Sequence, residues 1–182
     1  CIMCGIYGAV FAAGAAYTGK NISVKINLNK KYNFMQNKKY KLNFELVPDS
    51  CWYSNLRSML SPSQWGAVRR KVCAEANGRC MICGAPSKRL EAHEQWEYDE
   101  GSCTQRLVRI VAVCPACHAV IHIGRTQLKG DARAAEDHFM QVNGCSYAEM
   151  RAALGKANAD HIRRNAVPEW KLDIAALYQY IK

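Results

Sequence analysis

Acidic residues are absent from the first 44 positions of this 182-residue chain, and Glu45 is the first carboxylate. Residues 1–19 are uncharged and rich in Gly and Ala, and Lys- and Asn-rich sequence follows as far as Lys41. The apolar segment is interrupted by Gly, Tyr and Thr, whereas a membrane span needs roughly 20 strongly apolar residues. It also lacks the positive start of a signal peptide. We therefore expect residues 1–43 to form an N-terminal extension, poorly ordered or non-native upstream of Met35, and we expect no membrane partner.

The ten cysteines lack the regular spacing of a secreted disulfide scaffold. Four of them form the two central Cys-x-x-Cys pairs, Cys80/Cys83 and Cys114/Cys117, and four more are scattered, at Cys51, Cys73, Cys103 and Cys145; the other two, Cys1 and Cys4, lie in the N-terminal segment. Free thiols are typical of proteins in reducing compartments. The cysteine pattern therefore favours an intracellular protein, and we expect a cytoplasmic location.

The net charge of +10 favours a polyanionic partner. A solvated basic surface would explain the charge equally well. In a nucleic-acid complex, basic side chains such as these would contact phosphates and would not read the base sequence. Six basic residues lie close in the sequence to the first cysteine pair and are candidates for nucleic-acid binding: Arg69, Arg70, Lys71, Arg79, Lys88 and Arg89.

Carboxylates gather close to the same region of the chain. They occur at Glu91, Glu94, Glu97, Asp99 and Glu100. A nuclease can use acids around a metal ion. A protein that only binds DNA has less reason to place them against a polyanion. The acidic strip therefore favours a hydrolytic site.

Helix and strand signals predict an α+β protein. Ser61 precedes Pro62, and Gln64 follows the cap by three residues, so a capped helix begins there. Ser146 and Glu149 repeat the capping pattern. The expected helices cover residues 61–78, 115–122, 131–142, 146–165 and 172–181. The expected strands cover residues 88–94 and 107–113, with residues 96–100 in the loop between them.

The two cysteine pairs predict a structural zinc site. Cys80 with Cys83 and Cys114 with Cys117 have the two-residue gap that lets both sulfurs of a tight turn reach one tetrahedral ion. The order strand, strand, helix around them is a small ββα unit, which buries too little apolar surface to be stable alone. We therefore expect a zinc-stabilised ββα core flanked by helices.

Three histidines predict a second metal site. His118 and His122 are four residues apart, so on a helix they project from one face and can share an ion. His93, on the preceding strand, would reach the same point if the helix packs across the hairpin. The alternative is that His118 caps a helix and His122 is an ordinary interfacial histidine.

These motifs resemble the HNH endonucleases of the ββα-metal class. The residues that carry the likeness are Cys80-x-x-Cys83, Leu90-Glu-Ala-His93-Glu94 and Cys114-x-x-Cys117-His118-x-x-x-His122. The chain is more closely similar to a bacterial and phage subgroup with His-Glu-x-Trp-x-Tyr-Asp, here His93 to Asp99. Flanking likenesses extend the resemblance over roughly residues 44 to 174. It implies a metal-dependent hydrolase that acts on DNA in the cytoplasm of a bacterial or phage-infected cell.

The resemblance also implies roles for individual residues. His93 falls at the strand ligand position, and His118 and His122 fall at the helix positions that hold one divalent ion (Mg, Mn, Ni or Zn). Glu94 occupies the position of the general base, where the family usually has His, and it could instead bind metal. If the register is shifted by one residue, His93 becomes the base and Ala92 takes a ligand position that it cannot fill. The candidate catalytic residues are therefore His93, Glu94 and His118.

The sequence thus predicts an HNH nuclease domain over residues 44–182, with C-terminal helices. A second hypothesis is a zinc-dependent nucleic-acid-binding protein that kept the fold and lost catalysis. A third is a structural zinc domain that serves protein partners.

Overall fold

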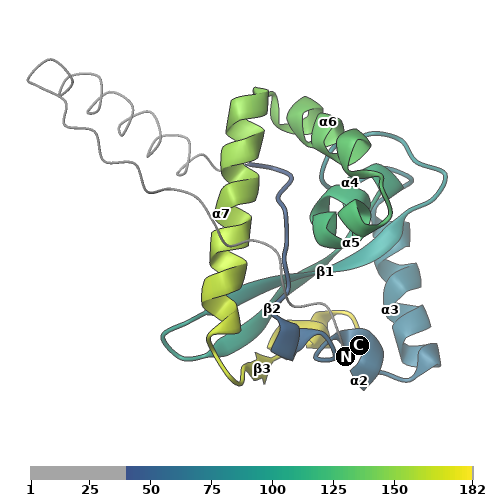
Figure 1. Ribbon diagram of the computed structural model, residues 1–182. Helices are drawn as coiled ribbons and strands as arrows, with labels where there is room; N and C mark the ends of the chain where they lie inside the picture. Colours follow the sequence, from purple (N-terminus) through teal and green to yellow (C-terminus); the bar gives the residue numbers. More distant parts are fainter. Residues whose placement is uncertain (1–39, 182) are drawn as a thin grey trace, which may run out of the picture.

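The computed structural model describes residues 40–181. Most of the expected extension, including Met35, lies outside the described residues. The sheet has three strands in the order β1-β2-β3, with β1 antiparallel to β2 and β3 parallel to it (Figure 1). Their bounds are β1 (Glu91–Asp99), β2 (Thr104–Val113) and β3 (Lys171–Asp173). The mixture of helices and a small sheet agrees with the predicted α+β class.

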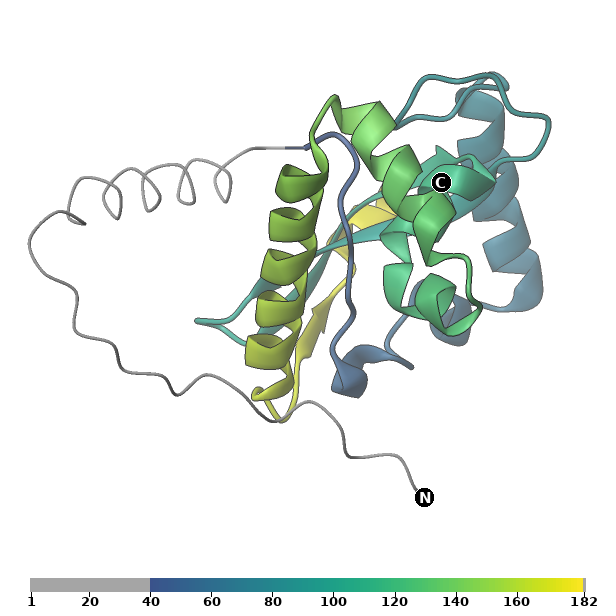
Figure 2. The same ribbon diagram turned by 45° about the horizontal axis from the view of Figure 1, so that its top comes forward.

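Helices cover both faces of this sheet (Figures 1 and 2). Successive residues of β2 point to opposite faces, so Val111 and Val113 belong to one core and Ile110 and Ala112 to the other. The first core packs under α4, α6 and α7, and the second under α2, α3 and η2. The helical elements are η1 (Asp49–Cys51), α2 (Leu56–Met59), α3 (Pro62–Glu75), α4 (Pro115–Ile121), α5 (Ile123–Leu128), α6 (Ala132–Asn143), α7 (Tyr147–Asn165) and η2 (Ala175–Gln179).

Both predicted capping boxes are present. At the start of α3, the Ser61 hydroxyl accepts a hydrogen bond from the Gln64 N–H, and the Gln64 side chain accepts one from the Ser61 N–H. Ser146 and Glu149 make the same reciprocal pair at the start of α7. Each box satisfies N–H groups that have no partner within the helix. Local sequence therefore fixes where these two helices begin.

Two predicted elements differ in the structure. Residues 96–99, expected in a loop, continue β1, because they pair with β2 beyond an irregularity between Gln95 and Trp96. The expected helix over residues 172–181 is wrong: β3 adds to the free edge of β2, and only the short 3₁₀ helix η2 follows. The Asp173 carboxylate accepts the Ala175 N–H. This turn redirects the chain after β3.

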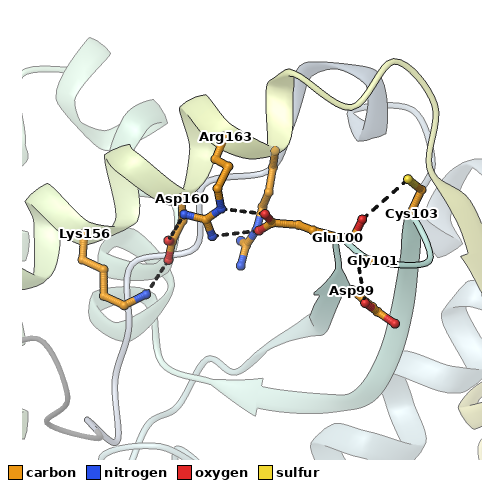
Figure 3. A network of polar contacts seen from close by, with 8 residues as sticks. Asp99, Glu100, Gly101, Cys103, Lys156, Asp160 and Arg163 are labelled. Atoms are coloured by element: carbon orange, nitrogen blue, oxygen red, sulfur yellow. Dashed lines mark hydrogen bonds and ion pairs between the residues drawn. The ribbon is translucent and has the colours of Figure 1, made fainter.

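The tip of the β1–β2 hairpin is tied to α7 by charged side chains (Figure 3). The Arg163 guanidinium donates from Nε and Nη2 to the two oxygens of Glu100, at 2.6 and 2.7 Å. Asp160 accepts from Arg163 at 3.0 Å and from Lys156 at 2.6 Å. Bidentate pairing of this kind fixes geometry. The network therefore holds α7 beside the end of β1.

The packed part of the chain begins before the expected boundary at residue 44. Leu42 is fully buried in the first core, and the N–H groups of Lys41 and Leu42 both donate to the Asn143 side-chain oxygen. The segment from Tyr40 to Val47 then runs between α7 and the helices α4 and α5 (Figure 1). Within residues 40–181, no helix is both long enough and apolar enough to cross a membrane.

Candidate metal centres

Four cysteines meet where the loop after α3 contacts the start of α4. Cys80, Cys83, Cys114 and Cys117 each offer a sulfur within 4.8 Å of the other three, and the Cys83 and Cys114 sulfurs lie 3.9 Å apart. Zinc–sulfur bonds of about 2.3 Å in a tetrahedron separate the sulfurs by about 3.8 Å. Three of the four side chains are buried. The predicted cluster is therefore present, and its geometry is compatible with a structural zinc ion.

Local backbone geometry builds the first half of this cluster. The Gly84 N–H donates to the Cys80 carbonyl, and the Cys80 N–H donates to the Ala85 carbonyl. Gly84 has a φ of +75°, which costs little without a Cβ. The Met81 N–H donates to the Ala112 carbonyl and so fixes the turn to β2. The two-residue gap in the sequence is thus realised as a tight turn beside the sheet.

Electrostatics in the cysteine cluster favour at least one thiolate. Burial raises the pKa of Cys80, but N–H groups of Cys83, Cys114 and Ile82 lower it to about 7. Burial and the negative charge of neighbouring cysteines raise the pKa of Cys117. His138 on α6 lies beside it, with Nε2 3.2 Å from the Cys117 sulfur. Sequence reasoning missed His138, because no motif links it to the cysteines.

Three histidines form a separate group on the same ββα unit. His93 on β1, His118 on α4 and His122 at the end of α4 each offer a ring nitrogen within 4.8 Å of the other two. Their ring centroids are 4.6 to 5.5 Å apart. His93 is buried, and the other two are half-buried. The three residues predicted to share an ion therefore do lie together.

The secondary structure explains this convergence. His93 pairs across the sheet with Val111, so its side chain faces the core that α4 covers. His118 and His122 are separated by about one turn of α4, and the His122 N–H donates to the His118 carbonyl. Because α4 packs across β1, the two helix imidazoles meet the strand imidazole.

Two carboxylates support the imidazoles. His93 Nε2 lies 3.0 Å from Glu45 Oε2, and His118 Nδ1 lies 2.6 Å from Glu91 Oε2. Each contact occupies one ring nitrogen and leaves the other for a metal ion. Histidine ligands in metal sites are commonly oriented by such carboxylate contacts. Sequence reasoning did not assign this role to Glu45, whose only signal was its position as the first acid of the chain.

His118 and His122 are predominantly neutral near pH 7. Burial, followed by the positive charge of His93, lowers the pKa of His118. Burial, followed by the charges of His93 and His118, lowers the pKa of His122 to about 3. A neutral imidazole keeps the lone pair that binds metal. The donor set therefore fits a divalent ion of the borderline class that includes Zn²⁺ and Ni²⁺.

Glu94 is not part of the histidine group. This placement differs from the expectation that Glu94 is the general base or an additional metal ligand. Adjacent strand residues point to opposite faces, and Glu94 pairs with Ile110, which belongs to the second core. Burial raises the pKa of Glu94, and a hydrogen bond from the Leu56 backbone opposes this effect. Its carboxylate thus faces α2 and not the three imidazoles.

The predicted nucleic-acid-binding residues have different surroundings. Arg89 is exposed and lies 2.9 Å from Glu91, the residue that contacts His118. Arg79 donates to the Gly84 carbonyl beside the cysteines, and the half-buried Lys71 donates to the Gln179 carbonyl. Arg69, Arg70 and Lys88 are exposed. Of the six, Arg89 is the one that these contacts connect to the histidine group.

Arg125 is a further cation near the histidine group that sequence reasoning missed. It is exposed on α5, directly after α4, and its charge lowers the pKa of both His118 and His122. Arg89, in the loop before β1, and Arg125, on α5, thus place positive charge beside the histidine group.

Comparison with known proteins adds no identification. No family model, curated protein or solved structure matches this chain. The description of the two centres therefore rests on their own geometry.

Proposed function

We propose that this protein is an HNH-type, metal-dependent endonuclease that hydrolyses phosphodiester bonds in DNA. The observation that carries the proposal is the group of three imidazoles, two of them hydrogen-bonded to carboxylates, on a ββα unit that also holds a four-cysteine cluster. A donor set of imidazoles with a supporting carboxylate shell is typical of a functional ion. Separate, more deeply buried cysteines suit a structural one.

The residues then have distinct roles. Cys80, Cys83, Cys114 and Cys117 would hold zinc and stabilise the ββα unit. His93, His118 and His122 would hold the second divalent ion, which when bound supplies Lewis-acid stabilisation of charge on the phosphate. Glu45 and Glu91 orient the first two imidazoles and raise their basicity as ligands.

Charge near the imidazoles supports a phosphodiester substrate. Arg89 contacts Glu91 and is exposed, so its remaining N–H groups can reach a phosphate. Arg125 adds a second cation from α5. Guanidinium groups match phosphate oxygens well. Together with the net charge of +10, these side chains favour a polyanion over a neutral ester.

One observation favours a second candidate, a DNA-binding protein that does not cleave. Glu94 occupies the base position of the HNH pattern, and its side chain faces α2. A centre that lacks a positioned base would bind a phosphate through its ion and its cations without efficient hydrolysis. The same experiment tests both candidates.

Plasmid cleavage after chelation and metal addition tests the proposal. The purified protein receives Mg²⁺, Mn²⁺, Ni²⁺, Zn²⁺ or no ion, beside His118→Ala and a matched control, His161→Ala, on α7 outside the two centres. We expect metal-dependent nicking or linearisation that His118→Ala loses and His161→Ala keeps. Folding of each variant is checked by circular dichroism. Absence of cleavage with every ion, with DNA binding retained, would leave the non-catalytic candidate.

A further inference from the structure

Glu45 reaches the histidine group from residues 40–47, a segment that belongs to no helix or strand. We call these residues the strap. The strap passes between α7 and the helices α4 and α5 (Figures 1 and 2), and it brings Glu45 Oε2 to 3.0 Å from His93 Nε2. Backbone outside helices and sheets must find its hydrogen-bond partners elsewhere. The position of the Glu45 carboxylate therefore depends on the residues that hold the strap.

Asn143, the last residue of α6, holds the strap with both ends of its side-chain amide. The amide oxygen accepts hydrogen bonds from the N–H groups of Lys41 and Leu42, at 3.0 and 3.1 Å. The amide nitrogen donates to the Leu42 carbonyl at 2.9 Å. An amide is the side chain that can both accept from and donate to one stretch of backbone in this way. These three bonds fix the strap three residues before Glu45.

The strap also packs on α6 through apolar side chains. Leu42 is fully buried in the first core. The Phe44 ring stacks on the Phe139 ring of α6, with centroids 4.4 Å apart and planes 8° apart. Phe139 and Asn143 are four residues apart, so one face of α6 makes both kinds of contact. The helix α6 therefore fixes the residues immediately before Glu45.

The backbone of Glu45 is bound in turn to α4. Its N–H donates to the Ile121 carbonyl at 3.0 Å, one residue before His122. The strap thus joins α6 to the helix that positions two of the three imidazoles. A carboxylate that contacts a histidine ligand orients the ring and raises its basicity. Release of the strap would therefore remove this support from His93.

We propose that Asn143 is a positioning residue for the ion that the histidine group would hold. Asn143 contacts the backbone of the strap, and it acts on the ion through Glu45 and His93. Docking of the strap and binding of the ion then favour each other, because the coupling free energy between two sites is reciprocal. The inference rests on the ion site of the proposed function and not on DNA cleavage.

The Ni²⁺ affinity of an Asn143 variant tests this role. Isothermal titration calorimetry is carried out on protein that holds one zinc ion per chain. Asn55→Ala is the matched control, because the Asn55 amide also accepts from one N–H, that of Ser58, and donates to one carbonyl, that of Trp52, at the start of α2. We expect Asn143→Ala to bind Ni²⁺ about 10-fold more weakly, a loss typical for a residue that supports a metal ligand, and Asn55→Ala to bind as the unchanged protein does. Unchanged affinity in Asn143→Ala, or an equal loss in both variants, would overturn the proposal.

A double-mutant cycle shows whether Asn143 acts through Glu45. Ni²⁺ affinities are measured for Glu45→Ala, for Asn143→Ala and for the variant that carries both changes. If Asn143 serves to position Glu45, its replacement has little left to disturb once that carboxylate is gone. We therefore expect the double variant to bind Ni²⁺ within about 2-fold of Glu45→Ala. Losses that multiply would show two independent effects, and Asn143 would then have a structural role alone.

Hydrogen exchange measures docking of the strap without any nuclease assay. Mass spectrometry follows the peptide that covers residues 40–47 in zinc-loaded protein, with and without Ni²⁺. We expect Ni²⁺ to slow exchange in the unchanged protein, because the ion favours the docked strap, and exchange that does not respond to Ni²⁺ would contradict the coupling. A Ni²⁺ effect on the strap without plasmid cleavage would retain the role of Asn143 and reject the nuclease. Plasmid cleavage with full Ni²⁺ affinity in Asn143→Ala would do the reverse, and no Ni²⁺ binding by the unchanged protein would reject both.

Discussion

The cysteine cluster and the histidine group share the same ββα unit, yet they are built differently. Three of the four cysteines are buried, and neighbouring N–H groups lower the pKa of Cys80. The histidines are less buried, and two of them are contacted by carboxylates from positions far away in the sequence. In the cysteine cluster, a turn or a helix start organises each pair, and packing joins the two pairs. In the histidine group, packing must also bring in the strand imidazole and the supporting carboxylates.

This difference underlies the proposal that the histidine group, and not the cysteine cluster, carries the chemistry. A closed set of four buried sulfurs leaves no position for a substrate. Three imidazoles leave coordination positions open, and His118 and His122 are half-buried, with Arg89 linked to the group through Glu91. In our proposal the cysteine cluster therefore has the stabilising role and the histidine group the reacting one.

Replacing Cys117 should give the largest effect. Structural zinc binding contributes about 10–16 kcal/mol in zinc-finger peptides, which is as large as the total stability of roughly 5–15 kcal/mol of a typical protein. We therefore expect Cys117→Ser to lose its zinc and to unfold at room temperature. Zinc per chain from elemental analysis and the melting curve from circular dichroism check this.

The matched control for that variant is Cys51→Ser, which changes a buried cysteine outside the cluster. It should keep one zinc ion per chain and a cooperative melting curve. If Cys117→Ser retains zinc as Cys51→Ser does, the cysteine cluster is not the structural site.

Replacing Glu45 should give an intermediate effect at the histidine group. Loss of a carboxylate that orients a ligand typically costs 10- to 100-fold in metal affinity. We expect Glu45→Gln to weaken Ni²⁺ binding by about that factor in zinc-loaded protein, with folding unchanged. Isothermal titration calorimetry measures the affinity.

Glu94→Gln provides the comparison for Glu45→Gln. Its carboxylate faces α2, so Ni²⁺ affinity should stay near that of the unchanged protein. An equal loss in both variants would contradict the assignment of Glu45 as the supporting residue. Loss of cleavage in Glu94→Gln with full Ni²⁺ affinity would contradict the placement of its carboxylate away from the reacting centre.

Replacing His138 should give the smallest effect, at the cysteine cluster. Its ring lies 3.2 Å from the Cys117 sulfur, and one hydrogen bond contributes about 0.5–1.5 kcal/mol. We expect His138→Leu to release zinc a few-fold to roughly 10-fold faster, measured as the rate at which a chromophoric chelator takes up the zinc. His138→Asn keeps a donor and should restore part of the slow release. Identical rates for both variants would show that the ring acts by packing alone.

Much of the fold could be predicted from local sequence, because its signals act within one turn. Ser61 with Gln64 and Ser146 with Glu149 begin α3 and α7 as expected. The end of β1 and the C-terminal segment could not be predicted, because their structure depends on pairing with β2. Residues 171–173 have a partner strand only once the hairpin has formed.

The sequence by itself determined the spacing of the ligands. Cys80 with Cys83, Cys114 with Cys117 and His118 with His122 are close because a turn or a helix brings near neighbours together. Tertiary structure decided which carboxylates reach the imidazoles. Glu45 is 48 residues from His93, and only packing of its segment against α4 joins them. The alternating direction of strand side chains took Glu94, one residue from His93, to the opposite face.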